Sequence, residues 1–339
     1  MVFVDSNENF NFRQMIQDWL TQSWLHKEPN PAYREALTAV LQVLWSGANT
    51  AQGSSRISFL PLPSLCARAL GKVNETTTAV NAAWVLLYTA SNLLDKVEDE
   101  ETEHPIFAHL SPSVVLNLTT GLILHSERIL AELEPQSGTT RAEVIDALRR
   151  KFNQAALEVC AGQHLDLTVR EPGFHEIWEI VDGKSGKFFS LGAYLGARLA
   201  AEDAAVVEAF SEMGRRLGIL IQIRNDLQDF GGDQDTGSDL ASEKRTLPVL
   251  YALQVLPAEE RAQLATLLTA AQIDPAAEIA ARKMIKSAGA IVYLCLEAEK
   301  HYLQARKTLD LLGLEPQAVQ PLIDLLDFAN PTKKLLNRR

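Results

Sequence analysis

The stretch TAVNAAWVLLYTASNLLD, residues 78–95, is apolar on nearly every side when it is read as a helix, and the charged run KVEDEE, residues 96–101, follows it directly. A helix that is apolar all round must be surrounded by other elements. The stretch therefore predicts a central, buried helix that ends at an acidic patch. That patch is either a solvated helix end or a place where two carboxylates hold a cation.

Helical periodicity continues on both sides of this stretch. Apolar residues recur at three- and four-residue spacing in RAEVIDALRRKFNQAALEVCAGQ (141–163) and in DAAVVEAFSEMGRRLGILIQIRNDL (203–227), whereas alternating patterns with hairpin signals are scarce. Proline and glycine punctuation divides the chain into about ten or more helices with mostly short connections. Since no repeat or low-complexity linker is visible, we expect one all-α domain over residues 1–339, with long helices surrounding a core.

Composition and charge exclude some classes of function. With 339 residues, 47% of them hydrophobic, and a formal net charge of −11, the chain can bury a large core but lacks the basic face of a nucleic-acid-binding protein. No apolar run is long enough for a membrane span, and the N-terminus MVFVDSNENF lacks a basic start. We therefore expect a cytoplasmic protein without a membrane span.

Two smaller features are interpreted conservatively. Cys66, Cys160 and Cys295 lie far apart among apolar residues without metal-ligand spacing, so we expect buried thiols. The tail over residues 331–339 is basic, in contrast to the rest of the chain. It is either a solvated end or a segment that contacts anions or a membrane.

The first candidate site is the acidic patch itself. Asp95 and Asp99 are four residues apart and project from one helical face, one turn from each other. Two carboxylates at that distance repel each other unless a cation lies between them, and a helix C-terminus is the wrong end for negative charge. We interpret Glu98, Glu100 and Glu101 as surface charge.

The second candidate site is QIRNDLQDFGGD, residues 222–233, which follows the apolar run LGILI. Asn225 and Asp229 share one helical face, Asp226 lies beside them, and Asp233 is four positions further on. These oxygen ligands are the kind that Mg²⁺ takes, usually together with waters and substrate phosphates. Two acidic helix ends predict a deep pocket with metal at its mouth, and a coincidence of two solvated helix ends is the alternative.

Cationic side chains follow in two further segments. Lys184 and Lys187 lie in VDGKSGKFF (181–189), and Lys244 and Arg245 precede the apolar run TLPVL. Such a lysine is either the partner of a carboxylate in an ion pair or an anion clamp for a metal-bound diphosphate. Both interpretations stay open.

Five segments in this order resemble the motifs of the trans-polyprenyl diphosphate synthase family, a group of class I isoprenoid synthases. The segments are DKVED (95–99), GQHLD (162–166), GKSGKFF (183–189), NDLQD (225–229) and DLASEKRTLP (239–248), and the resemblance covers about residues 50–255. It implies a large all-α bundle of the isoprenoid synthase type around a central apolar cavity. It also implies an allylic prenyl diphosphate as substrate, Mg²⁺ as cofactor, with three ions bound, and a homodimer.

Carried over by residue, the resemblance implies that Asp95 and Asp99 bind two Mg²⁺ ions, and that Asn225 or Asp226, with Asp229, holds a third. Asp233 is a further metal-ligand candidate. Lys184 and Lys244 would grip the diphosphate, assisted by Gln163, Asp166 and Gln222. The candidate catalytic residues are therefore Asp95, Asp99, Asp226, Asp229, Lys184 and Lys244, and the further candidate substrate contacts are Arg56, Tyr88, Phe188, Lys187 and Arg245.

Departures from the family pattern gather in the acceptor site for isopentenyl diphosphate. In GSSRISF (53–59) only Arg56 matches the family's basic segment, a family histidine is Tyr88, and an arginine pair falls on Glu101 and Thr102. Lys96 and Asn225 also replace motif aspartates. Because a diphosphate needs guanidinium counter-charges, ordinary chain elongation is expected to be impaired.

Three hypotheses follow for function. The favoured one is a terpene synthase-like enzyme, or a prenyltransferase with an unusual acceptor, that ionises one allylic diphosphate and releases pyrophosphate. The alternative is a conventional farnesyl- or geranylgeranyl-type diphosphate synthase that condenses with isopentenyl diphosphate. A catalytically silent partner subunit is the third, although such a subunit has no need to keep mutually repelling acids.

Residues just before the first motif bear on the width of a channel for the prenyl chain. Ala90 and Ser91, just before the first motif, are small, which favours a channel for a long prenyl chain unless Leu87 or Tyr88 caps it. Aromatic side chains in these segments are candidates for carbocation stabilisation, with core packing as the commoner role. They are Trp84, Tyr88, Phe188, Phe189 and Phe230.

Overall fold

The computed structural model of the protein describes residues 7–50, 59–100, 104–135, 141–169, 172–231, 240 and 246–336, without the side chains of residues 7–11, 46–50, 229, 231 and 334–336. Every regular element in these ranges is a helix, mostly α with a few 3-10 and π turns. The all-α prediction is therefore confirmed.

Two compact units divide the chain. The first comprises residues 1–154, 191–211 and 312–325, and the second comprises residues 155–190, 212–311 and 326–339. Four helices have residues in both units: α6 (Ala142–Thr168), α8 (Lys187–Ala200), α9 (Ala204–Gly231) and α14 (Pro316–Ala329). The prediction of a single domain over 1–339 stays a prediction, and each unit is described separately below.

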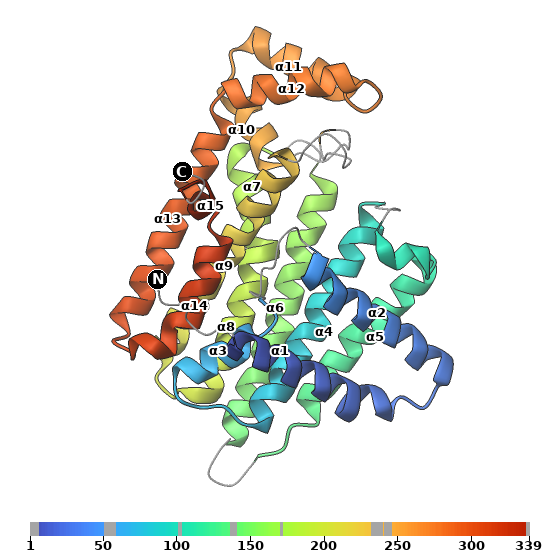
Figure 1. Ribbon diagram of the computed structural model, residues 1–339, viewed down its shortest axis with the longest axis vertical. Helices are drawn as coiled ribbons and strands as arrows, with labels where there is room; N and C mark the ends of the chain where they lie inside the picture. Colours follow the sequence, from blue (N-terminus) through green and yellow to red (C-terminus); the bar gives the residue numbers. More distant parts are fainter. Residues whose placement is uncertain are drawn as a thin grey trace. The chain divides into compact units, whose positions relative to one another are not determined.

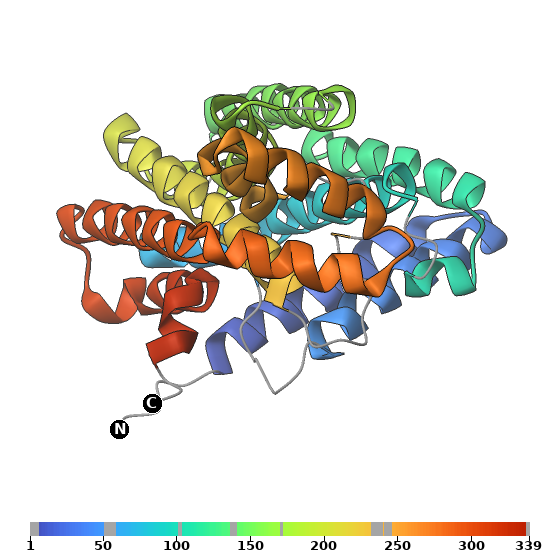
Figure 2. The ribbon, with the colours of Figure 1, turned by 90° about the horizontal axis from the view of Figure 1, so that it is seen from above.

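The first unit is arranged around α4 (Glu75–Glu98), which packs against α1, α3 and α5 and runs side by side with α5 (Figures 1 and 2). The other elements of this unit are α1 (Asn7–Trp19), η1 (Leu20–Trp24), η2 (Leu25–Lys27), α2 (Pro31–Thr50), α3 (Leu62–Ala69), η3 (Pro105–Ala108) and α5 (Pro112–Ala131).

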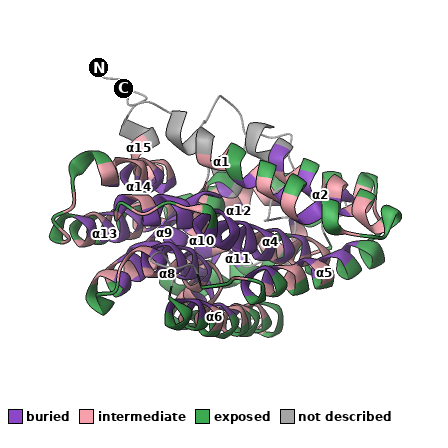
Figure 3. Ribbon diagram, turned by 90° about the horizontal axis from the view of Figure 1, so that it is seen from below, coloured by how far each residue is buried: buried purple, intermediate pink, exposed green. Residues whose placement is uncertain are grey.

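Burial of α4 agrees with its all-round apolar sequence. Most of the helix is buried, and the Trp84 side chain is 0% exposed (Figure 3). Two glycines let α8 approach closely: a Cβ at Gly192 would lie 2.8 Å from the Trp84 ring, and one at Gly196 would lie 2.0 Å from the Pro63 carbonyl oxygen. The central, buried helix predicted over 78–95 is therefore confirmed.

The second unit contains the C-terminal parts of α6 and α9 and a helical hairpin. Its other elements are α7 (Phe174–Val181), η4 (Asp182–Gly186), α10 (Leu247–Val255), α11 (Ala258–Ala270), α12 (Pro275–Ser287), α13 (Ala290–Leu311) and α15 (Pro331–Leu336). Helices α11 and α12 lie side by side (Figures 1 and 2), and α10 packs against α7 and α13.

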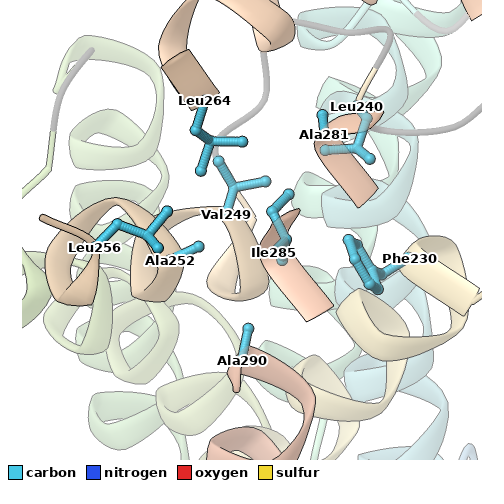
Figure 4. Packing of buried hydrophobic residues seen from close by; sticks show 9 residues of the cluster. All are labelled: Phe230, Leu240, Val249, Ala252, Leu256, Leu264, Ala281, Ile285 and Ala290. Atoms are coloured by element: carbon cyan, nitrogen blue, oxygen red, sulfur yellow. The ribbon is translucent and has the colours of Figure 1, made fainter. Parts of the chain in front are cut away.

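A buried apolar cluster contains residues of α9, α10, α11, α12 and α13, together with Leu240, in this unit (Figure 4). Removing these apolar side chains from water stabilises the packing of the hairpin helices against α9 and α10. The members are Phe230, Leu240, Val249, Ala252, Leu256, Leu264, Ala281, Ile285 and Ala290.

Proline and serine set several helix starts as the punctuation predicts. Helices α2, α5 and α14 begin at Pro31, Pro112 and Pro316, and the Ser111 hydroxyl accepts a hydrogen bond from the backbone N–H of Val114. A proline in the first turn loses nothing, because the first N–H groups of a helix have no intrahelical acceptor.

The prediction of three buried thiols is right only in part. Cys66 is buried, but Cys160 is exposed on α6 and Cys295 is half-buried on α13. Apolar neighbours in the sequence misled here, because a helix turns successive residues to different faces. Among the described residues, no helix is both long and apolar enough to cross a membrane.

Candidate active site

The end of α4 carries the first acidic motif, in the first unit. The helix begins with a capping box in which the Asn74 side chain accepts from the Thr77 N–H at 3.0 Å and the Thr77 hydroxyl accepts from the Asn74 N–H at 3.3 Å. It ends at Glu98, and the backbone N–H of the C-cap residue Asp99 donates to the Asp95 carbonyl oxygen at 2.9 Å. Glu100 then takes a positive φ of 54°, which terminates the helix.

Asp95, in the last turn of α4, and Asp99, its C-cap, therefore lie one turn apart, as the sequence predicts. Both side chains are half-buried. Two negative charges at the negative end of a 24-residue helix are unfavourable, and the single lysine of that turn, Lys96, offsets them only in part. Their carboxylate oxygens are hard donors, the kind that binds a divalent cation together with waters or phosphates.

Upstream on the same helix, two aromatic side chains contact each other. The rings of Trp84 and Tyr88 stack with centroids 6.0 Å apart and an interplanar angle of 26°. Removal from water raises the pKa of Tyr88. Ala90 is buried and Ser91 is half-buried. The position that is a histidine in the family thus holds a neutral phenol, which cannot supply a positive charge to a diphosphate.

A π-helical turn holds Lys184 in the second unit. The turn, η4, interrupts the run from α7 into α8, a feature that the sequence analysis did not predict. Glycines permit it to lie against its neighbours: a Cβ at Gly162 would lie 2.6 Å from the carbonyl carbon of Gly183, and one at Gly218 would lie 2.1 Å from the Ser185 carbonyl oxygen. Inside the turn, Asp182 accepts from Arg215 Nε at 2.5 Å.

Lys184 and Asp166 form an ion pair. The side chains are 23% and 37% exposed, so water reaches both charges. This contact brings together GQHLD and GKSG, two segments that carry the family resemblance. Lys184 is consequently both an ion-pair partner and an accessible cation, and an entering anion would compete with Asp166 for its ammonium group.

A chain of hydrogen bonds connects η4 to α9 and α10. Ser185 Oγ donates to Gln222 Oε1 at 2.9 Å, Gln222 Nε2 donates to Asp226 Oδ1 at 2.7 Å, and the backbone N–H of Leu247 donates to Asp226 Oδ2 at 2.9 Å. Asp226 is only 6% exposed, and its charge lies at the N-terminus of α10, where it is favourable.

These bonds give Asp226 a positioning role within the second unit, because both of its oxygens accept from protein donors. Its neighbour Asn225 is exposed instead. Ser185 was not selected from the sequence. Its position between Lys184 and Gly186, in a turn that contacts α9, is the feature of the sequence that could have indicated it.

The other predicted site residues of this unit make contacts that are common in any protein. Lys187 pairs with Glu158, with Nζ and Oε2 3.2 Å apart. Phe188 and Phe189 are each 5% exposed and pack edge to face with centroids 5.8 Å apart, which is the geometry of core packing. Gln163 is half-buried on α6.

Several predicted site residues lie outside the described part of the chain. These are Arg56, Asp233, Lys244 and Arg245, together with the side chain of Asp229, whose backbone lies in α9. Among the residues that the structure does describe, no group of three or more His, Cys, Asp or Glu side chains is arranged to hold a metal ion. Any metal bound by these residues would need oxygens from water or substrate to complete its shell.

Comparison with known proteins identifies the class to which this fold and these motifs belong. The polyprenyl synthetase family model matches residues 65–286, more than half of the chain. A geranylgeranyl pyrophosphate synthase from Geoglobus acetivorans is 28% identical over 281 residues, which cover 78% of this chain and 82% of the relative. A geranylgeranyl diphosphate synthase from Mycobacterium tuberculosis is 29% identical over 259 residues, 71% of each protein.

The fold has solved counterparts as well. The crystal structure of a polyprenyl synthetase from Streptomyces coelicolor superimposes with a TM-score of 0.79 at 21% identity, covering 96% of this chain and 99% of that one. The protein belongs to the polyprenyl synthetase family, and it has the all-α fold of the isoprenyl synthases. The family resemblance inferred from the five motifs is confirmed, although the match runs from 65 to 286 rather than from 50 to 255.

Proposed function

We propose that this protein is a prenyltransferase that condenses an allylic prenyl diphosphate with isopentenyl diphosphate to give a farnesyl- or geranylgeranyl-type diphosphate. The family match over residues 65–286, together with relatives that are named geranylgeranyl diphosphate synthases, carries the proposal. The motifs alone favoured a terpene synthase-like enzyme. The comparisons support the conventional synthase better.

Mg²⁺ fits the residues of this chain. Asp95 and Asp99 offer two hard oxygen donors one turn apart, and Asn225 and Asp229 share a face of α9. We assign these four residues to metal binding, with Asp233 as a further candidate. When bound, the metal would stabilise the negative charge that develops on departing pyrophosphate.

The chain's own cations would act on the same leaving group. Lys184 would exchange its contact with Asp166 for a diphosphate oxygen, and Lys244 would add a second positive charge. The Ser185–Gln222–Asp226 hydrogen bonds would keep η4 and α9 in a fixed relation during this exchange. Apolar side chains would have to exclude water from the allylic cation, so that the isopentenyl double bond reacts first.

A second candidate function rests on the acceptor residues. Ser55, Ser58, Glu101 and Thr102 replace basic residues of the family pattern, and Tyr88 is a half-buried, neutral phenol. An acceptor diphosphate would find fewer counter-charges here. This favours ionisation of a single allylic diphosphate, with water, an internal double bond or another acceptor taking the cation.

One incubation separates the two functions. The purified protein, Mg²⁺ and allylic diphosphates of ten, fifteen or twenty carbons are combined with and without isopentenyl diphosphate, and pyrophosphate and organic products are measured. Longer diphosphates formed only with isopentenyl diphosphate support the proposal. Pyrophosphate with a hydrocarbon or alcohol in its absence supports the second candidate. If no pyrophosphate forms under either condition, both functions are contradicted, and the hypothesis of a catalytically silent partner subunit is favoured.

Three further expectations accompany the proposal. We expect a homodimer, three Mg²⁺ ions bound with the substrate, and a cytoplasmic location. Gel filtration with light scattering tests the first, and metal titration in the presence of an allylic diphosphate analogue tests the second.

A further inference from the structure

The C-terminal end of α9 is held by a helix that lies outside the five motifs. Phe230 is in the last turn of α9, directly after Asp229, and its carbonyl oxygen accepts a hydrogen bond from Arg282 of α12. The last four carbonyl groups of a helix have no intrahelical donor. A cation there also compensates the negative end of the helix dipole. Arg282 therefore supplies both a donor and a charge where α9 needs them.

A second contact fixes the direction of the Arg282 side chain. Arg282 Nε donates to Glu278 Oε1 at 3.0 Å, one turn earlier on α12, and the two side chains are 18% and 24% exposed. A half-buried guanidinium that bonds to two partners loses most of its rotational freedom. Arg282 is thus a rigid support rather than a flexible surface arginine.

The Phe230 ring adds an apolar anchor beside this hydrogen bond. It is 4% exposed and packs in the cluster that includes Ala281 and Ile285 of α12 (Figure 4). The guanidinium carbon of Arg282 is 5.5 Å from the ring centroid, and Nζ of Lys286 is 5.9 Å from it. The backbone and the side chain of one residue are therefore both held by the same helix.

We propose that Arg282 is a positioning residue for the second acidic motif: by capping α9 at Phe230, it keeps the last turn helical and Asn225 and Asp229 on one face. Only the statement that this face binds metal rests on the proposed function. The capping itself stands on the contacts above. Without the cap, the turn that carries Asp229 would fray, since nothing in α12 would bind the Phe230 carbonyl group.

Arg282→Met tests the proposal, and Arg261→Met is its matched control. Arg261 makes the same kind of contact nearby, because its NH2 donates to the carbonyl oxygen of Leu256, the C-cap of α10, at 3.0 Å. Amide hydrogen exchange is measured for residues 226–231, and binding of Mn²⁺ in the presence of inorganic pyrophosphate is measured by electron paramagnetic resonance. Neither readout requires turnover.

For Arg282→Met we expect exchange in residues 226–231 to accelerate about tenfold, the equivalent of one lost charge-assisted hydrogen bond, and the Mn²⁺ concentration for half-saturation to rise about tenfold. Arg261→Met should change neither. Arg282→Lys should show smaller changes in exchange and in Mn²⁺ binding than Arg282→Met, because lysine keeps the positive charge. Glu278→Gln should also change both quantities in the same direction, but less.

Three results would overturn the inference. Unchanged exchange in residues 226–231 would remove the capping role. An equal acceleration over the whole chain would make Arg282 a contributor to global stability only, and local acceleration with unchanged Mn²⁺ binding would separate the cap from the metal site. Failure of the proposed function looks different: the wild type would bind Mn²⁺ and pyrophosphate, and Arg282→Met would weaken this, while no prenyl diphosphate is made.

Discussion

At the scale of single residues, the carboxylates at the end of α4 carry an electrostatic cost that a bound cation would reduce. Asp95 lies in the last turn of α4 and Asp99 is its C-cap, and the helix dipole disfavours negative charge at this end. In the second unit, by contrast, the buried Asp226 is compensated by the N-terminus of α10 and by two donors. Aspartates at two helix ends therefore lie in opposite electrostatic surroundings, unfavourable at the end of α4 and favourable at the start of α10.

Replacing either α4 carboxylate should separate stability from activity. For Asp95→Asn and Asp99→Asn we expect pyrophosphate release to fall by about 100-fold or more, because each removes a charged metal ligand. The free energy of unfolding should stay equal or rise by about 0.3–1 kcal/mol, because a carboxylate leaves the negative helix end. Activity assays and urea titrations measure the two effects.

Glu98→Gln is the control for this pair, since Glu98 is exposed in the same turn. It should keep wild-type activity. A double Asp95→Asn, Asp99→Asn variant that still releases pyrophosphate at the wild-type rate would rule out metal binding at the end of α4.

His301 makes stability depend on pH. Burial, reinforced by Arg216, Lys300 and Arg215, lowers the pKa of His301 to about 3, although Glu297 Oε2 lies 4.0 Å from Nε2. Below about pH 6.5 the unfolded chain takes up a proton that the folded protein refuses until about pH 3. This side chain should therefore lower the free energy of unfolding by up to about 1.4 kcal/mol for each pH unit between these values.

Urea titrations of the wild type and of His301→Gln at pH 7, 6 and 5 measure this effect. Other groups titrate in the same range, but they are common to both proteins, so the difference between the two slopes isolates His301. The variant should lose less stability on acidification. Parallel curves would mean that His301 becomes protonated in the folded protein.

At the scale of elements, close backbone approaches decide where Lys184 lies. Gly162 of α6 and Gly218 of α9 leave room for the π-helical turn η4. Glycine is required at such contacts because any Cβ would meet backbone atoms, which cannot move aside like a side chain. The motif GQHLD thus combines a packing residue, Gly162, with the ion-pair partner Asp166.

Gly162→Ala should displace η4. Its Cβ would lie 2.6 Å from the Gly183 carbonyl carbon and 2.9 Å from the backbone nitrogen of Lys184. We expect the free energy of unfolding to fall by about 1–3 kcal/mol, as for other overpacked sites, and the activity to fall with it. Chemical denaturation and product assays measure the two quantities.

Gly173→Ala serves for comparison, because the nearest atom to its Cβ would be Glu176 Oε2 at 3.4 Å, the end of a flexible side chain. Its cost should stay below about 1 kcal/mol, the usual range for an alanine at a helix N-cap. Equal costs for the two variants would show that the contact between Gly162 and Gly183 is not tight in solution.

At the scale of the whole molecule, the division into two compact units bears on cooperativity. Helices α6, α8, α9 and α14 each have residues in both units, so neither unit contains all of its helices complete. Helix formation is itself cooperative along a continuous segment. The single domain expected from the sequence therefore makes a specific thermodynamic prediction.

We expect one cooperative unfolding transition for the full chain. Differential scanning calorimetry should give a single peak whose calorimetric and van't Hoff enthalpies agree for the cooperative unit. Far-ultraviolet circular dichroism and tryptophan fluorescence should report the same midpoint. Two resolved transitions would contradict the single-domain prediction and favour two separately folding units.

Much of the fold followed from local sequence. The apolar stretch 78–95 determined a buried helix, prolines marked the starts of α2, α5 and α14, and motif order was sufficient for the family. The spacing of Asp95 and Asp99 placed them one turn apart, because helical geometry depends only on separation along the chain. Such features need no knowledge of distant contacts.

Only the tertiary structure decided which side chains meet. It paired Lys184 with Asp166, linked Ser185 through Gln222 to Asp226, placed Arg282 on the end of α9, and exposed Cys160. These contacts join residues far apart in the sequence, and no local pattern encodes them. The sequence determined the helices and the chemical groups that they carry, whereas packing determined which of these groups bind each other, because packing depends on the whole chain at once.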